Sequence, residues 1–330
     1  MNLQERIELM VWLGNYIKEN DSEWQEVKTR AAAENGWFIN TFIDIACKQI
    51  TEKFLQKNIL ETWVAHYKLD DNFIPKTVGI VMAGNIPLVG FHDFLCVFIS
   101  GHAQRIKFSS KDKVLLNHLV NKLHEKSVGT KELISISDLL KNCDAYIATG
   151  SNNSSRYFDQ YFAKYPHIIR RNKTSAAVLK GNETNDELNK LSDDIHLYFG
   201  LGCRNVTKLY VPEGYDFIPL LRSFDKYLFF ADHHKYKNNY DYQLSILLLN
   251  NKYYMTNGST LVTESEGMFS PIAHLHFEYY KDFDTLEKSL EKHPELQCSV
   301  IKEKGFGIAQ EPGIFDYADG VDTMEFLLAL

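Results

Sequence analysis

The sequence predicts an α/β fold with two lobes and a helical segment in front of them. Three observations carry this prediction: helical spacing of apolar residues near the N-terminus, alternation of short β-branched runs with helical stretches in the middle, and a second α/β stretch beyond residue 184. Such alternation indicates mostly parallel sheets covered by helices. With 330 residues, of which 45% are apolar, the chain can bury a large core in two lobes or in one large domain.

Residues 1–75 are expected to form a helical segment that packs on the domain that follows. Apolar side chains recur there at spacings of three and four residues, which is the pattern of amphipathic helices. The positions are Ile7, Met10, Leu13, Ile17, and then Phe42, Ile45, Ala46, Ile50 and Phe54.

Residues 76–181 are predicted to form the first sheet-containing domain. Short strand-like runs alternate there with helical stretches such as 113–126, which favours parallel strands joined by helices. The strand-like runs are TVGIVMA, QRIKFS, AYIAT, HIIRR and SAAVLKG.

Residues 182–310 are predicted to form the second α/β domain. A helix over 185–199 leads to Cys203, and the strand-like run KLYVP follows it. A helical region around 216–250 then precedes two further strand-like stretches, YYMTNGSTLVTES and AHLHFEYY. The last segment, 311–330, has turn signals and an apolar end, so we expect it to fold back on one of the two domains.

Composition argues against several classes of partner. Lys and Arg are scattered and the net charge is −7, so the chain lacks the basic stripe that nucleic acid or an anionic membrane would need. No run approaches the roughly 18 apolar residues of a membrane span, and the charged N-terminus does not resemble a signal peptide. We therefore expect a cytoplasmic protein without a membrane span.

The five cysteines are far apart, and no two of them form a CxxC motif. This spacing argues against a disulfide framework or a zinc knuckle, so free thiols are expected. The pair His274 and His276 would share one face of a strand, which is a possible metal-ligand arrangement. Because no Cys, Asp or Glu joins them at metal-like spacing, we predict no metal site.

Cys203 is the candidate nucleophile. Gly200 and Gly202 allow a tight bend before it, and the polar residues Arg204, Asn205 and Thr207 could begin a helix whose N-terminal amides favour a thiolate. The alternative is a small buried hydrophobic residue. Cys96, on an apolar helical face, fits that alternative better than Cys203 does.

Two residues at strand ends are candidates for binding or catalysis. Asn85 follows the strand-like run VGIVMAG and precedes Pro87, so its amide could donate to a developing oxyanion. The alternative is a turn residue that caps the following helix. Lys107 ends the run QRIKFS, with Ser109 behind it, in the position where ligands bind open α/β sheets. The alternative is a solvated lysine at the sheet edge.

Thr149, Gly150 and Ser151 form a small turn between a predicted strand and a predicted helix. Backbone amides in such a turn can face a phosphate. The turn matches neither GxGxxG nor GxxxxGK[ST], and there is no GxSxG elbow to support serine hydrolysis.

At these residues the chain resembles the aldehyde dehydrogenase superfamily, and specifically its acyl-CoA reductase branch, which includes the fatty-acyl reductase of bacterial bioluminescence. The resemblance is distributed over most of the chain after residue 76. It implies that Asn85 lies in the oxyanion hole, that Lys107 with Ser109 contacts the adenosine ribose, and that the turn at 149–151 faces the cofactor phosphates. It also gives Cys203 the thiolate role.

A further segment, ESEGMFSPI, resembles the superfamily's Glu-x-Phe-Gly-Pro segment near the nicotinamide ribose. Phe269 and Pro271 are in register with it. The position two residues before Phe269 is Gly267, so the glutamate is displaced by one residue to Glu266. The resemblance therefore implies cofactor contacts from Phe269 and, with this displacement, from Glu266.

The chain departs from hydrolytic aldehyde dehydrogenases in one informative place. These enzymes carry a water-activating Glu in a Glu-Leu-Gly-Gly segment, whereas the corresponding stretch here, RRNKTSAAVLKG, has no carboxylate. The resemblance then implies NADPH- or NADH-dependent reduction of an acyl-CoA or acyl-carrier thioester to an aldehyde through an acyl-cysteine. Two alternatives remain: an aldehyde dehydrogenase working in the oxidative direction, and a nucleotide-binding scaffold without catalysis.

The resemblance also implies an aldehyde dehydrogenase-like architecture. Its parts would be a helical segment over 1–75, a Rossmann-like NAD(P) domain over 76–181, a catalytic thiol domain over 182–310 and a C-terminal segment over 311–330. The active site would lie in the cleft between the two domains, and a homo-oligomer is expected. Arg105 or Lys107 could accept a cofactor 2′-phosphate.

Overall fold

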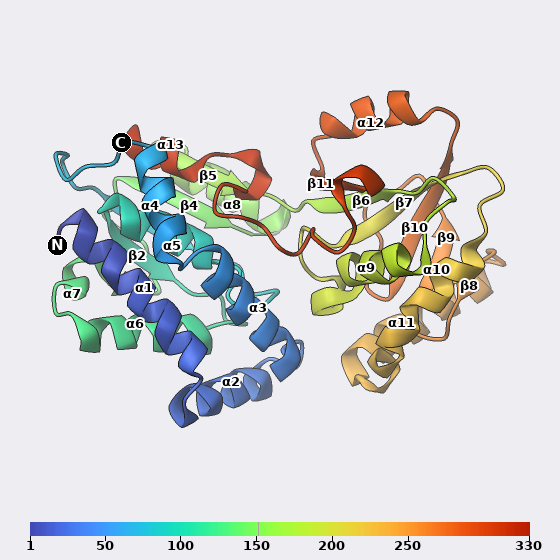
Figure 1. Ribbon diagram of the computed structural model, residues 1–330, viewed down its shortest axis with the longest axis horizontal. Coiled ribbons are helices and arrows are strands. Elements are labelled where there is room, and N and C mark those ends of the chain that lie inside the picture. The colour runs from blue at the N-terminus through green and yellow to red at the C-terminus, as the bar shows by residue number, and fades with distance from the viewer. Residues whose placement is uncertain (151) are drawn as a thin grey trace. The chain divides into compact units, whose positions relative to one another are not determined.

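The computed structural model describes residues 1–150 and 152–330, and it divides them into two compact units. Unit 1 contains residues 1–172 together with 312–330, and unit 2 contains residues 173–311. Figure 1 shows the elements of both units in chain order. Ser151, one of the three residues of the predicted phosphate turn, lies outside the described residues.

Four helices precede the sheet of unit 1, as the apolar spacing predicted. They are α1 (Leu3–Glu19), α2 (Ser22–Glu34), α3 (Asn40–Lys53) and α4 (Lys57–His66). Asn2 and Glu5 form a capping box at the start of α1, and Asp21 caps α2, so free backbone amides at both helix starts are satisfied. The buried faces carry Met10 and Trp24, each with no exposed surface, into the unit 1 core.

Among its described residues, unit 1 holds a five-stranded parallel sheet with the order β3-β2-β1-β4-β5. The strands are β1 (Thr77–Val81), β2 (Ala103–Lys107), β3 (Ile134–Ile136), β4 (Ala145–Thr149) and β5 (His167–Arg170). The connecting helices are α5 (Phe91–Ser100), α6 (Val114–Lys126), α7 (Thr130–Leu133) and α8 (Asn152–Phe162). This order reverses direction between β1 and β4, which creates the switch point of a doubly wound sheet.

The C-terminal segment belongs to unit 1. Its helix α13 (Thr323–Leu328) packs on α5, after a short 3₁₀ helix, η4 (Ala318–Gly320). The indole N–H of Trp63 donates to the hydroxyl of Tyr317 at 2.8 Å. Arg170, at the end of β5, donates to the carbonyl of Ala318 and to the hydroxyl of Thr323. The segment therefore folds back on the first unit, a choice that the sequence had left open.

Unit 2 holds a six-stranded sheet, counted over its described residues, with the order β11-β6-β7-β10-β9-β8. Its strands are parallel except for the antiparallel pair β8 and β9. The strands are β6 (Thr174–Val178), β7 (Val206–Pro212), β8 (Met255–Thr256), β9 (Leu261–Glu264), β10 (His274–Tyr280) and β11 (Leu296–Ile301).

The helices of unit 2 are α9 (Asn185–His196), α10 (Phe217–Ser223), α11 (His234–Leu249) and α12 (Phe283–Glu291). Three 3₁₀ helices accompany them: η1 (Leu197–Gly200), η2 (Phe224–Asp232) and η3 (Lys302–Lys304). The run SAAVLKG was expected in the first domain, but β6 lies between β11 and β7 in the sheet of unit 2. The division therefore falls between residues 172 and 173 instead of near 181. All five residues of β6 are buried, and its apolar side chains pack into two cores, Ala177 in one and Ala176 and Val178 in the other.

The fold class predicted from the sequence is confirmed: the chain is a mixed α/β protein with parallel sheets and a helical N-terminal segment. Across the described residues, no helix combines the length and the apolar character needed to cross a membrane.

Candidate active site

The backbone before Cys203 makes an unusual left-handed turn. Tyr198 and Phe199 have φ angles of 56°, and Gly200 follows with φ of 72°. Glycine adopts this region freely, whereas each side-chain-bearing residue in a sparsely populated region costs about 1–3 kcal/mol. Aromatic packing holds the turn in place, since the ring centroid of Phe199 lies 4.4 Å from those of both Phe230 and His233. Strain of this kind clusters at functional sites.

Asn205 ties this turn together from inside the protein. The side chain has no exposed surface. Its Oδ1 accepts a hydrogen bond from the backbone N–H of Gly202 at 2.8 Å. Its Nδ2 donates to three backbone carbonyls: those of Asp194 (3.1 Å), Ile195 (3.3 Å) and Leu197 (2.9 Å). One buried amide therefore connects the end of α9 to the turn that carries the thiol.

The strand expected at KLYVP is confirmed, whereas the polar residues directly after Cys203 do not begin a helix. Cys203 lies in a turn, and β7 begins at Val206. Asn205 directs its side chain back to the preceding turn, so the chain enters the sheet directly. Ser175 Oγ, from β6, donates to the carbonyl of Cys203 at 3.0 Å. A rigid turn, instead of a helix N-terminus, thus positions Cys203, whose side chain is half-buried and forms no disulfide.

Ser175 also brings a second thiol to this turn. Its Oγ lies 3.0 Å from Sγ of Cys298, which is the register partner of Ser175 on β11. Since the single hydroxyl proton of Ser175 is used on the carbonyl of Cys203, the thiol of Cys298 donates to Ser175. In the sequence, Cys298 was one of five thiols expected to be free, and nothing set it apart. Only the pairing of β11 with β6, which joins segments over a hundred residues apart, reveals this contact.

In unit 1, the predicted nucleotide-binding residues gather at the carboxyl edge of the sheet. Val81, the last residue of β1, pairs with Lys107 at the end of β2 and with Ala148 near the end of β4. Lys107 is exposed there, and Thr149 is the last residue of β4. These ends flank the switch point, where open α/β sheets bind ligands.

The loop that carries Asn85 also lies at this edge. The alternative that Asn85 caps the next helix is wrong, because the N-cap of α5 is Gly90, five residues later. The loop packs closely on the segment after β2: a Cβ placed on Gly84 would lie 2.7 Å from Oγ of Ser109. Leu88 adopts φ of 56°, and its N–H donates to Oδ2 of Asp112 at 2.9 Å.

Asp112 is a residue of this loop region that the sequence analysis missed. It is only 7% exposed, and its Oδ1 has no hydrogen-bond partner in the described part of the chain. Burial raises the pKa of this carboxyl to about 7, and the hydrogen bond from Leu88 opposes the rise. No motif marked Asp112, since its significance arises from burial under the loop.

In unit 2, side chains hold the loop between β9 and β10 that carries Glu266 and Phe269. Thr207 Oγ1 donates to the carbonyl of Met268 at 2.8 Å, and Lys208 Nζ donates to the carbonyl of Ser265. Nδ1 of His276 lies 2.9 Å from the carbonyl oxygen of Gly267. Burial lowers the pKa of His276, so a neutral ring can donate this hydrogen bond.

The two predicted cofactor residues of this loop differ in exposure. Glu266 is exposed, whereas Phe269 is half-buried and packs on a small core that includes Met268. Lys208, which lies beneath the loop, has no exposed surface and forms an ion pair with Oε2 of Glu278 at 2.8 Å. Lys208 and His276 were both missed as supports of this loop.

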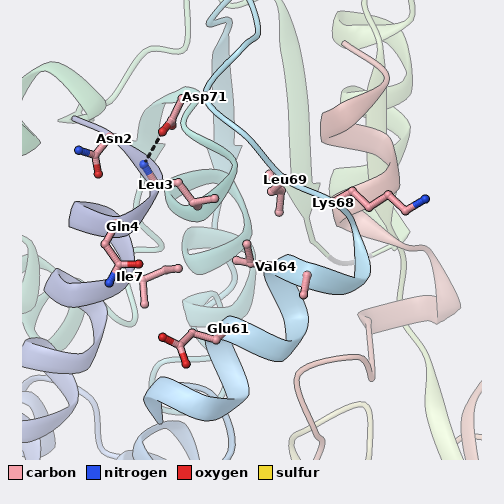
Figure 2. Close-up of a pocket in the computed structure, with 10 residues that line it drawn as sticks. Asn2, Leu3, Gln4, Ile7, Glu61, Val64, Lys68, Leu69 and Asp71 are labelled. Atoms are coloured by element: carbon pink, nitrogen blue, oxygen red, sulfur yellow. Dashed lines mark hydrogen bonds between the residues drawn. The ribbon is translucent and has the colours of Figure 1, made fainter.

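A surface hollow of about 600 Å³ lies elsewhere, between α1 and α4. Figure 2 shows Leu3 and Ile7 on one side of it and Val64 on the other, with the N–H of Leu3 donating to Asp71. None of the predicted site residues lines this hollow. Across the described residues, no group of three His, Cys, Asp or Glu side chains is placed to hold a metal ion.

Comparison with known families gives the geometry a context. The model of the acyl-CoA reductase (LuxC) family matches residues 47–218, more than half of the chain. The matched stretch contains Asn85, Lys107 and Cys203. The chain belongs to the acyl-CoA reductase (LuxC) family. This membership confirms the resemblance drawn from the motifs, although no curated protein matches the chain in sequence.

Solved structures of aldehyde dehydrogenases share the fold of this LuxC-family chain. Aldehyde dehydrogenase 21 of Physcomitrella patens, in complex with the reaction product succinate, aligns with a TM-score of 0.71 and 11% identity, over 100% of this chain and 84% of its own. HpcC of Thermus thermophilus gives 0.69 and 12%, over 91% and 74%. A mutant of the indole-3-acetaldehyde dehydrogenase AldA of P. syringae, in complex with NAD+ and IAA, gives 0.65 and 9%, over 91% and 76%. At these identities the likeness establishes the fold.

Proposed function

We propose that this chain reduces an acyl thioester, such as an acyl-CoA or an acyl-carrier thioester, to an aldehyde with NADPH or NADH. The observation that carries the proposal is the setting of Cys203. This thiol lies in a turn that contains backbone strain and is held by the buried Asn205, within the segment that the acyl-CoA reductase model matches. A half-buried thiol in a turn that buried hydrogen bonds hold suits a nucleophile.

In the proposed reaction, the thiolate of Cys203 attacks the thioester carbonyl. Asn85 and the backbone amide of Cys203 are the proposed donors to the oxyanion. The carrier thiolate leaves and takes up a proton, which gives an acyl-cysteine. Addition of a hydride to the carbonyl carbon of this thioester forms a tetrahedral anion. Its collapse releases the aldehyde and restores the Cys203 thiolate, so the sum consumes one reduced cofactor and one proton.

The carboxyl edge of the unit 1 sheet fits a nicotinamide nucleotide. Lys107 and Thr149 end the two strands that flank β1, and Gly84, in the loop after β1, packs against the side chain of Ser109. Lys107 and Ser109 would contact the ribose, and the turn at 149–151 would face the phosphates. When bound, the reduced nicotinamide supplies the hydride. In unit 2, Glu266 and Phe269 are the proposed contacts of the nicotinamide ribose.

Cofactor choice depends on which basic residue meets the adenosine ribose. One N–H of the Arg105 guanidinium donates to the carbonyl of Lys141, which directs the side chain toward the segment between β3 and β4. Lys107 is exposed two residues further along the same strand, at the sheet edge. Of the two basic residues, Lys107 is therefore the better proposed partner for a 2′-phosphate.

The oxidative alternative, aldehyde dehydrogenation to an acid, needs a base that activates water. The stretch from 170 to 181 supplies no carboxylate. Its first residue, Arg170, is buried and paired with Asp93. The absence of a base in this stretch of sequence favours reduction. The scaffold alternative predicts a Cys203 that does not react with acyl donors.

The test is incubation of the purified chain with a series of acyl-CoAs and NADPH or NADH, while cofactor absorbance is followed and aldehyde is trapped. Aldehyde formation should disappear in Cys203→Ala and persist in the matched control Cys143→Ala, whose thiol is buried in unit 1. Retained aldehyde formation in Cys203→Ala would overturn the mechanism. Acylation of Cys203, read by intact mass, tests the first half-reaction without cofactor.

A further inference from the structure

A line of hydroxyl groups crosses the sheet of unit 2 beside the thiol turn. Thr174 Oγ1, on β6, lies 2.5 Å from Thr207 Oγ1, on β7, and Thr207 Oγ1 donates to the carbonyl of Met268 at 2.8 Å. Thr207 has only one hydroxyl proton, and it is used on Met268. Thr174 therefore donates to Thr207 over the shorter of its two contacts, the other being 3.4 Å to the carbonyl oxygen of Asn205, so the hydrogen bonds run from Thr174 through Thr207 to Met268.

A β-bulge places Thr207 in this position. On β6, Ser175 and Ala176 are consecutive, but their register partners on β7 are Val206 and Lys208. Thr207 is thus the extra residue of β7. Bulges of this kind redirect a side chain, and they are common beside active sites. Without the bulge, alternation along β7 would give Thr207 a different direction from the one that reaches Met268.

Thr207 joins two parts of the proposed site. It lies four residues after Cys203, at the start of the strand that the thiol turn enters. Its partner, Met268, lies directly before Phe269, in the loop proposed to contact the nicotinamide ribose. The carbonyl of Met268 is thereby fixed from the strand that follows the nucleophile.

We propose that Thr207 is a positioning residue that sets the loop of Glu266 and Phe269 for cofactor binding and hydride transfer, and that it has no part in acylation of Cys203. The inference rests on the proposed function and extends it to a residue outside the sequence motifs. Acylation depends on the thiol turn, which the side chains of Asn205 and Ser175 hold, while Thr174 Oγ1 makes a longer contact of 3.4 Å with the carbonyl oxygen of Asn205. Cofactor binding depends on the loop, which Thr207 holds through its side chain together with Lys208 and His276.

The variant Thr207→Val keeps the branched shape of the side chain and removes the hydroxyl. It leaves the carbonyl of Met268 without its donor, and the Kd for the reduced cofactor should rise by about fivefold to tenfold, in line with one lost hydrogen bond. The rate of Cys203 acylation, measured by intact mass without cofactor, should stay within about twofold of wild type. Thr207→Ser retains the hydroxyl and should restore near wild-type cofactor binding.

Three further variants complete the design. Thr174→Val removes the hydroxyl that donates to Thr207 and leaves the bond to Met268, so it should weaken cofactor binding less than Thr207→Val does. Thr207→Ala also lacks the hydroxyl and keeps the test decisive if Thr207→Val does not fold. Thr256→Val is the matched control. Thr256 lies on the edge strand β8, and its hydroxyl forms a hydrogen bond with the hydroxyl of Tyr240 on α11. This control should leave both readouts unchanged.

Unchanged cofactor binding in Thr207→Val, or an equal loss of acylation and cofactor binding, would overturn the positioning role. If Thr207→Val is unfolded, wild-type cofactor binding in Thr207→Ala, which also lacks the hydroxyl that donates to Met268, would overturn it. Failure of the proposed function gives a different result. In the wild-type chain, Cys203 is then not acylated and the reduced cofactor does not bind, and this result would also overturn the inference. Weakened binding with intact acylation supports both.

Discussion

The two units hold their proposed functional groups in different ways. In unit 1, Lys107 and Thr149 are strand-end residues, and their neighbourhood follows from the order and register of a parallel sheet. In unit 2, the setting of Cys203 depends on individual side chains, above all the buried amide of Asn205. A site whose residues are placed by strand order and register should tolerate substitutions of neighbouring side chains. A site whose residues are placed by side-chain hydrogen bonds should be sensitive to single substitutions.

The buried cations of the two units give the largest expected contrast. Arg170 in unit 1 is 3% exposed, and its partner Asp93 is 9% exposed. Arg170→Met would leave this carboxylate buried without a counter-ion, which typically costs about 3–5 kcal/mol. In unit 2, the partner of Lys208 is Glu278, whose side chain is 41% exposed and can be hydrated. Lys208→Met should cost much less, about 1 kcal/mol.

Hydrogen exchange and urea unfolding measure this difference. In Arg170→Met, amides of the C-terminal segment should lose protection first, because Arg170 also donates to Ala318 and Thr323. The double variant Arg170→Met with Asp93→Leu removes both charges and should recover part of the loss. Equal destabilisation by Arg170→Met and Lys208→Met would show that solvation of the partner does not set the cost.

The substitution Asn205→Asp should produce the largest effect on the thiol. A carboxylate cannot donate to the three backbone carbonyls that Nδ2 now contacts, and it adds a buried negative charge beside them. Loss of about 3 kcal/mol from this network would slow Cys203 acylation roughly a hundredfold. The measurement is the acylation rate by intact mass. Asn250→Asp is the matched control, since this exposed amide bonds within its own helix end.

Nucleotide binding by unit 1 should be unaffected in Asn205→Asp. A parallel loss of nucleotide binding would break the distinction between the units, because it would show that the effect spreads beyond the thiol turn. Near wild-type acylation would show that backbone packing alone, including the aromatic contacts of Phe199, maintains the turn.

Sequence reasoning recovered unit 1 better than unit 2 for a physical reason. Strand ends such as Lys107 and Thr149 can be located from the local sequence. A parallel sheet places these ends along one edge, independently of the contacts that their side chains make. The run SAAVLKG was assigned to the wrong sheet, because its hydrophobic pattern does not reveal which strands will flank it. The strand after Cys203 was predicted, but the role of Asn205 was not, because it depends on carbonyls that only the folded turn presents.

The supports of the site were invisible for the same reason. Ser175, Thr207 and Lys208 act through carbonyls and thiols that are distant in the sequence, and the bulge at Thr207 appears only when β6 and β7 pair. Asp112 likewise looks like an ordinary turn residue until burial is known. The sequence therefore identified the candidate reactive groups, whereas their positioning residues required the folded chain.

The smallest expected effect is a change in how the free energy of unfolding depends on pH. One buried aspartate in each unit should contribute to it. Burial raises the pKa of Asp112 in unit 1 from 3.8 to about 7, and that of Asp194 in unit 2 from 3.8 to about 6. A carboxyl with a raised folded pKa stabilises the fold fully below 3.8, and this contribution is lost as the pH rises through the folded value. The wild-type chain should therefore lose stability from this source between about pH 4 and pH 7.

The variant Asp112→Asn cannot titrate at this position. Its free energy of unfolding relative to wild type should rise with pH by up to about 1.4 kcal/mol per pH unit across that window. For Asp194→Asn the rise should end near pH 6. This variant also carries a constant penalty. The two oxygens of Asp194 each accept a backbone N–H, from Gly307 and Ala309, and the amide nitrogen that replaces one oxygen cannot accept a hydrogen bond.

Urea unfolding at pH 4, 5.5, 7 and 8 separates these two contributions. Oδ1 of Asp112 has no hydrogen-bond partner among the described residues, so its replacement by an amide nitrogen should cost little at pH 4, in contrast to the penalty expected for Asp194→Asn. A flat difference between Asp112→Asn and wild type from pH 4 to 7 would show that this carboxyl is already ionised in the folded chain. The loop of unit 1 would then be held by a charged hydrogen bond to Leu88, as the carboxylate of Asp194 holds its loop in unit 2, and the contrast between topological and side-chain support would narrow.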